Sequence, residues 1–182
     1  MLIKVGLDLD GIIIDLPPFV PKTVIDFFYE DKKSQDLHYR IPSAFEQKIR
    51  QLTHLPFIRP PIKNNLATLK KAHDSGKYEF FLISSRFGFL QNLTYSWLRK
   101  YHAFNLFTQI YLNTQNKQPH LYKEDILKKV TVKWYLEDDF KCLMYLAPRF
   151  TKIHFYYYEK RESVVLDKDN VTAVNNLETI FK

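Results

Sequence analysis

The chain has 182 residues, of which 46% are hydrophobic and 26% are charged, and its net charge is +7 at neutral pH. This composition is that of a globular domain with one core and room for a small insertion, and it excludes a disordered or fibrous protein. The single cysteine, Cys142, excludes an internal disulfide and favours a reducing, cytoplasmic location. Met1 leads into the first apolar run without a secretory signal, and no apolar stretch is long enough to span a bilayer, so we expect no membrane association.

The positive charge favours anionic ligands through the overall electrostatic field. The basic residues are scattered along the chain and interleaved with acids, as in the segment 123–133. A nucleic-acid ligand is therefore compatible with the charge but is not favoured by its pattern, and a solvated basic face explains most of these residues.

The first apolar run enters Asp8-Leu9-Asp10-Gly11. An apolar run that ends at a glycine predicts a buried strand, and alternate side chains of a strand share a face, so we expect Asp8 and Asp10 to project together. Two neighbouring carboxylates repel each other and are costly to desolvate. A divalent cation, or a proton shared with a substrate, would offset both costs. The alternative is a strand end that carries two solvated aspartates.

Residues 16–61 are predicted to form a small helical cap, because prolines interrupt the chain at both of its ends. A helix is predicted over 22–31. A second helix begins at Ser43, where Ser43-Ala44-Phe45-Glu46 has the pattern of a capping box. Aromatic side chains of the cap are candidates for stacking on a base, although we expect such apolar stripes to be core; they are Phe19, Phe28, Phe45 and Phe57.

Helices and apolar strands alternate from residue 62 onward. Helices are predicted over 62–74, 89–101, 122–130 and 140–146, and strands over 78–83, 107–112, 132–136 and 153–157. A short strand over 163–166 and a closing helix over 176–181 complete the prediction, and Gly76 is placed to end the first of these helices. Alternation of this kind predicts an α/β fold, a Rossmann-like three-layer sandwich with a mainly parallel sheet. Residues 1–15 and 62–182 would form this core.

Polar residues follow several of the predicted strands. Ligands of such folds bind outside the carboxyl ends of the strands. Besides the aspartate pair, Ser84-Ser85-Arg86 follows the second strand and Glu137-Asp138-Asp139 follows the fourth. Lys123, at the start of a predicted helix, is the preferred cation for this edge. Lys117, Lys128 and Lys129 are alternatives, and each lysine is also explained as a solvated helix position.

Several carboxylates at one edge indicate a hard divalent cation with oxygen ligands, for which Mg²⁺ is the default. The six histidines show no spacing typical of zinc sites. A hydroxyl and a lysine beside such a cation suit a phosphate group. Two nearby aspartates can then act as nucleophile and as acid and base.

These residues resemble the four motifs of the haloacid dehalogenase (HAD) superfamily of phosphohydrolases over essentially the whole chain. The motifs are Asp8-Leu9-Asp10-Gly11, Ser84, Lys123 and Glu137-Asp138. Within the superfamily the chain looks like the 5'(3')-deoxyribonucleotidase-like group. The features behind this closer resemblance are Arg59-Pro60-Pro61, Ser84-Ser85-Arg86, Thr94-Tyr95-Ser96-Trp97-Leu98 and the small cap after the first strand.

The resemblance implies that Asp8 attacks phosphorus to form an aspartyl-phosphate, and that Asp10 serves as acid and then as base. It implies Mg²⁺ bound by the Asp8 carboxylate, the Asp10 backbone carbonyl and an acid of the fourth motif. Asp138 is the preferred acid, and Glu137 and Asp139 are alternatives.

For the phosphoryl oxygens, the resemblance implies Ser84 and Lys123 as ligands, with Ser85 beside them. Arg86 would clamp a phosphate or a nucleotide, or form a surface ion pair. Asp15 would contact substrate or, more simply, cap a helix or be solvated.

Three functions compete at this point. The first is a Mg²⁺-dependent phosphatase that acts on a small phosphorylated metabolite, with a nucleoside monophosphate as first choice. The second is a polynucleotide end-phosphatase. The third is a non-catalytic protein that keeps the fold and binds a partner. The presence of Asp10 argues against it, because a residue that acts as acid and base has no role in a protein that releases no leaving group.

Overall fold

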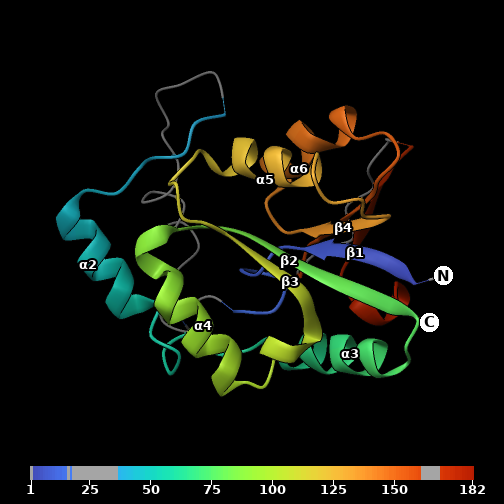
Figure 1. The fold of residues 1–182 in the computed structure, drawn as a ribbon, viewed down its shortest axis with the longest axis horizontal. Helices are drawn as coiled ribbons and strands as arrows, with labels where there is room; N and C mark the ends of the chain where they lie inside the picture. The colour runs from blue at the N-terminus through green and yellow to red at the C-terminus, as the bar shows by residue number, and fades with distance from the viewer. Residues whose placement is uncertain (1, 16, 18–36, 161–168) are drawn as a thin grey trace.

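The computed structural model describes residues 2–15, 17, 37–160 and 169–182. Six parallel strands form one sheet in the order β3-β2-β1-β4-β5-β6 (Figure 1). The strands are β1 (Ile3–Leu7), β2 (Tyr78–Phe87), β3 (Phe107–Asn113), β4 (Trp134–Glu137), β5 (His154–Tyr158) and β6 (Val171–Val174). β1 is central and pairs with β2 on one side and β4 on the other, so the segments after these three strands meet at one edge.

Helices cover both faces of the sheet. The described α-helices are α2 (Ala44–Thr53), α3 (Lys63–Asp74), α4 (Gln91–Lys100), α5 (Pro119–Leu127) and α6 (Phe140–Leu146). In Figure 1, α3 and α4 lie below the sheet and α5 and α6 lie above it. The buried side chains divide in the same way, since Leu69 and Trp97 pack on one face and Ile126 and Leu143 on the other. The expected three-layer α/β architecture is confirmed.

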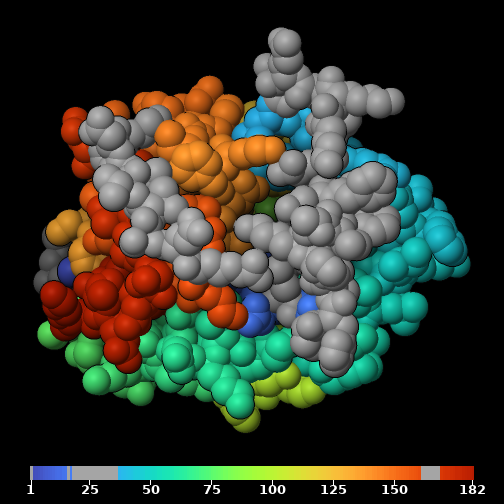
Figure 2. Space-filling view, turned by 180° about the vertical axis from the view of Figure 1, so that it is seen from behind, coloured from blue at the N-terminus to red at the C-terminus, as the bar shows by residue number. Residues whose placement is uncertain are grey.

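The carboxyl ends of the strands and the two chain ends lie on opposite sides of the molecule. In Figure 1, the N and C labels are at the right and α2 is at the left, beyond the carboxyl ends of β1 and β2. Seen from behind, the last residues (red) lie beside α3 (Figure 2), and Tyr78 of β2 donates a hydrogen bond to the Lys182 carbonyl at 3.2 Å. No helix among the described residues is long and apolar enough to cross a membrane.

Most predicted elements are found within a few residues of their expected positions. β2 is longer than expected, so Ser84, Ser85 and Arg86 are part of the strand rather than of the segment after it. β6 at Val171–Val174 was not predicted, and the closing helix is reduced to a short 3₁₀ turn at Leu177–Thr179. The helix predicted over 22–31 and the strand predicted over 163–166 lie outside the described residues.

The capping box at α2 is confirmed, because the Ser43 side chain accepts from the Glu46 amide and the Glu46 side chain accepts from the Ser43 amide. The expected burial of the apolar side of α2 is wrong: Phe45 is 72% exposed and Leu52 is 63% exposed. The helix instead turns the polar side chain of Arg50 inward, and this side chain is buried. The buried residue of α2 is therefore a polar one and not part of the apolar stripe.

Candidate active site

Asp8 is the first residue after β1 and is fixed at the carboxyl edge of the sheet. Its amide donates to the Leu136 carbonyl of β4 at 3.0 Å, and the side chain is buried. The chain then makes a tight turn in which the Gly11 amide donates to the Ile14 carbonyl at 2.9 Å. Ile12, Ile13 and Ile14 are fully buried, which anchors the turn below the carboxylates.

Gly11 is required at its position for two reasons. Its φ of +70° lies in the left-handed region, where an L side chain is strained. A β-carbon built on Gly11 would also collide with the carboxylate of Asp138, which follows β4. The glycine thus allows the first and fourth motifs to approach each other closely.

Lys123 on α5 joins the same group of carboxylates. Its Nζ lies 2.6 Å from Glu137 Oε2 and 3.3 Å from Asp8 Oδ1, and all three side chains are buried. The alternative lysines lie elsewhere: Lys117 pairs with Asp125 and Lys128 with Glu124, and both lysine side chains are exposed. Of these three lysines, Lys123 is the one that the structure brings to Asp8.

Burial and charge set the protonation of this group. Burial raises the pKa of Asp8 and raises that of Glu137 to about 7, while the positive charge of Lys123 opposes both shifts. Burial, with the charges of Asp8 and Glu137, raises the pKa of Asp138 well above its ordinary value. Burial would lower the pKa of Lys123, but Asp8 and Glu137 outweigh it and raise that pKa, so Lys123 is a cation here. The site carries more carboxylate than one lysine can neutralise.

A hard divalent cation fits this surplus. Asp8, Glu137 and Asp138 offer carboxylate oxygens that lie within 4.8 Å of one another. Asp139 is used differently: its side chain accepts from the Cys142 amide at 3.0 Å, capping α6, and from the Tyr39 hydroxyl at 2.5 Å. Of the three acids at the end of β4 and directly after it, Glu137 and Asp138 thus lie with Asp8.

The Asp10 carboxylate has other partners. Arg86 donates through Nε to Oδ2 at 2.6 Å and through Nη2 to Oδ1 at 2.7 Å, and Arg59 donates through Nη2 to Oδ1 at 2.5 Å. Burial would raise the pKa of Asp10, but the two guanidinium charges outweigh it and lower that pKa. The expected surface ion pair of Arg86 is found as a pair with Asp10 in which the arginine is buried.

The remaining predicted residues lie around this edge. Ser84 is buried and its hydroxyl accepts weakly from the Arg86 amide at 3.4 Å, while the Ser85 carbonyl accepts from the Asn113 side chain at 3.4 Å. Asp15 is paired with Lys160 at 2.8 Å on the surface. In the sequence, Arg59 stands out only as part of a Pro-rich motif, and Tyr39 carries no local signal. The signal for Arg59 was its place directly before the prolines that lead into α3.

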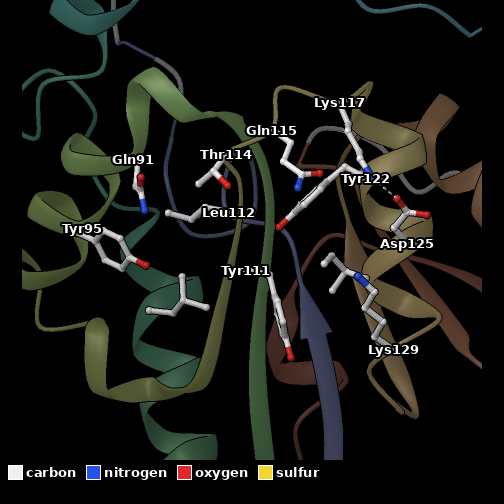
Figure 3. A pocket seen from close by; sticks show the side chains of 12 residues that line it. Gln91, Tyr95, Tyr111, Leu112, Thr114, Gln115, Lys117, Tyr122, Asp125 and Lys129 are labelled. Atoms are coloured by element: carbon white, nitrogen blue, oxygen red, sulfur yellow. Dashed lines mark hydrogen bonds and ion pairs between the residues drawn. The ribbon is translucent and has the colours of Figure 1, made fainter.

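A hollow of about 320 Å³ lies between α4, β3 and α5 (Figure 3). Tyr95, Tyr111 and Tyr122 line it together with Lys117 and Lys129. Tyr122 directly precedes Lys123, so α5 presents one residue to the hollow and the next to the buried carboxylates.

No family model and no curated protein sequence matches the chain. Solved structures match it in fold. The magnesium-bound HAD-hydrolase YfnB from Bacillus subtilis superposes with a TM-score of 0.64 at 10% identity, covering 99% of this chain and 97% of that one. The haloacid dehalogenase-like hydrolase SP0104 from Streptococcus pneumoniae gives 0.64 at 11% identity, covering 98% and 97%. The chain has the HAD fold.

A further match is a chain of the Pnkp1/Rnl/Hen1 RNA repair complex, with a TM-score of 0.55 at 15% identity. The match covers 86% of this chain but 42% of that one, so the HAD fold is one part of the larger protein. In this protein, the HAD fold brings Asp8 of the first motif, Glu137 and Asp138 of the fourth motif, and Lys123 to the carboxyl edge of one sheet.

Proposed function

We propose that the protein is a Mg²⁺-dependent phosphomonoester hydrolase that works through an aspartyl-phosphate at Asp8. The observation that carries the proposal is the buried cluster in which the Asp8 carboxylate lies with Glu137, Asp138 and Lys123. A cluster that served stability alone would be costly, because buried charges are stabilising only when fully paired. A divalent cation bound among the three carboxylates would balance the negative charge that Lys123 leaves.

In the first step, an oxygen of Asp8 forms a bond to phosphorus while the bond from phosphorus to the substrate oxygen breaks. Asp10 donates a proton to the departing alkoxide. The charge of Lys123 favours the ionised form of Asp8 against the effect of burial, and Lys123 is proposed to contact a phosphoryl oxygen as well. Ser84, at the end of β2, is proposed to donate its hydroxyl proton to a second one.

In the second step, water attacks phosphorus and the bond to Asp8 breaks, while Asp10 accepts the proton of the water. Mg²⁺, held by Asp8, Asp138 and Glu137, would neutralise charge on the transferred group. Asp10 is held as a carboxylate in this structure, which is the form that the second step requires. The first step requires the protonated form, so we propose that Asp10 takes up a proton when the negatively charged substrate binds beside it.

The substrate we propose is a nucleoside monophosphate or a similarly small phosphorylated metabolite. The support is the closer resemblance to the nucleotidase-like group in Arg59-Pro60-Pro61 and Ser84-Ser85-Arg86. This resemblance concerns residues around Asp10, which faces the leaving group in the proposed mechanism. We propose residues 16–61 as the cap that selects this leaving group.

The test is a panel of nucleoside monophosphates, sugar phosphates and a 3'-phosphorylated oligonucleotide, assayed for phosphate release with Mg²⁺ and with a chelator. We expect release that requires Mg²⁺ and is abolished in Asp8→Asn. The matched control is Asp74→Asn, because Asp74 is an exposed aspartate at the end of α3, away from the carboxyl edge of the sheet. Absence of release from every member of the panel would reject the hydrolase and favour a binding protein.

A polynucleotide end-phosphatase is the second candidate. The hollow between α4, β3 and α5 favours it, because three tyrosines and two lysines there provide stacking surfaces and positive charge, and α5 also carries Lys123. One structural neighbour is also part of an RNA repair complex. Under this candidate, Tyr111→Ala lowers turnover of the oligonucleotide but leaves that of p-nitrophenyl phosphate unchanged, and oligonucleotide turnover falls steeply with salt.

A further inference from the structure

Two buried arginines from distant parts of the chain hold the Asp10 carboxylate. Arg86, at the end of β2, binds both oxygens with its Nε and Nη2, and Arg59 adds a second donor to Oδ1. A carboxylate has about four acceptor positions, two on each oxygen. The described donors take both positions on Oδ1 and one on Oδ2, so one position on Oδ2 is left for a substrate or a water.

Helix α4 braces both arginines. Arg86 Nη1 donates to Thr94 Oγ1 at 3.2 Å, and the Trp97 indole donates to the Arg59 carbonyl at 2.7 Å. Thr94 and Trp97 are fully buried, so these anchors are fixed. The arginine side chains are 5% exposed, whereas that of Asp10 is 30% exposed. The group of this set that a ligand reaches from solvent is therefore Asp10.

We infer that Arg59 and Arg86 are positioning residues, which act on the reaction by aiming the one open acceptor position of Asp10 and do not bind the substrate themselves. This inference rests on the proposed function. It differs from the direct substrate clamp that the sequence suggested for Arg86, because the guanidinium that a clamp needs is covered and already engaged on both sides.

The first measurement is steady-state kinetics with two probes, phenyl phosphate and p-nitrophenyl phosphate. Phenolate is the poorer leaving group and depends more on proton donation by Asp10. In Arg86→Gln we expect kcat/KM to fall by up to about 100-fold for phenyl phosphate, within the range that general acid catalysis contributes. The loss for p-nitrophenyl phosphate should be several-fold smaller. Arg99→Gln, at an exposed arginine near the end of α4, is the matched control and should leave both values unchanged.

The second measurement distinguishes three possible roles of Arg86: orienting Asp10, supplying positive charge, and binding the substrate. Arg86→Lys keeps the positive charge but lacks the two guanidinium donors that bind both oxygens of Asp10. Compared with Arg86→Gln, it should therefore recover only part of the phenyl phosphate activity. In an Asp10→Asn background, Arg86→Gln should cost no more than about twofold, because its effect passes through Asp10. A raised KM with unchanged kcat, equal losses for both probes, or a full loss in the Asp10→Asn background would overturn the inference and identify Arg86 as a substrate ligand.

The third measurement does not depend on turnover. In ¹H–¹⁵N spectra of arginine side chains, Asp10→Asn should shift the Nε–H resonance of Arg86, because that group donates to Asp10. An unchanged resonance would show that the arginine does not hold Asp10 in solution. If wild-type protein turns over neither probe but the resonance shifts, the proposed function fails while the arginine contact stands.

Discussion

Replacement of Lys123 by methionine tests whether the buried carboxylates depend on this one cation. Methionine keeps the aliphatic length of the side chain and removes the ammonium group. The change leaves Glu137, which is 0% exposed, without the partner at 2.6 Å and removes the ion pair to Asp8 at 3.3 Å. Removing one member of a buried ion pair typically costs about 3–5 kcal/mol. That is a large part of the roughly 5–15 kcal/mol that stabilises a domain.

The assay is urea unfolding of wild type and variant, with chelator and with Mg²⁺. The matched control is Lys128→Met, the same substitution on the same segment, at a lysine that pairs with Glu124 in solvent and should change stability much less. We expect Mg²⁺ to recover part of the Lys123→Met loss, because it supplies positive charge to the same carboxylates. Equal losses for Lys123→Met and Lys128→Met would refute the reasoning.

Further predictions concern the turn, a buried histidine and the nucleophile. Gly11→Ala should destabilise the protein by about 1–2 kcal/mol through its positive φ and weaken Mg²⁺ binding in calorimetry by displacing Asp138. Burial, with the charges of Arg86 and Arg59, lowers the pKa of His54 from 6.5 to about 3, so the folded state binds fewer protons than the unfolded state between these values. Stability should therefore fall as pH drops through this window, by at most about 1.4 kcal/mol per pH unit for one group, and His54→Gln should flatten that slope in urea titrations. Asp8→Asn should abolish phosphate release while its circular dichroism spectrum stays that of wild type.

The fold was predictable because a parallel sheet that is covered on both faces leaves continuous apolar runs in the sequence. β1, β2 and β4 each produce such a run, and helix signals at Ser43 and Gly76 are local, so they could be read without the structure. β6 was missed because its four residues, Val171–Val174, include Thr172 and Ala173 and form no strong apolar run.

The partners of Asp10 could not be predicted from local patterns. Arg59 and Arg86 lie 49 and 76 residues from Asp10 in the chain, and only the sheet order and the path of the segment before α3 bring them together. The same holds for α2, where the sequence shows an apolar stripe but the buried residue is Arg50. Buried ion pairs between distant segments are where the structure adds most to the sequence.

The central claim is that Asp8 becomes phosphorylated during turnover. The most direct measurement is mass spectrometry of peptides from enzyme that is quenched in acid during hydrolysis of p-nitrophenyl phosphate with Mg²⁺. We predict that the peptide containing Asp8 carries the added mass of one phosphoryl group, and that this mass is absent with chelator and in Asp8→Asn. Phosphate release by an Asp8→Asn protein at the wild-type rate, or a phosphoryl group found on another residue, would contradict the mechanism.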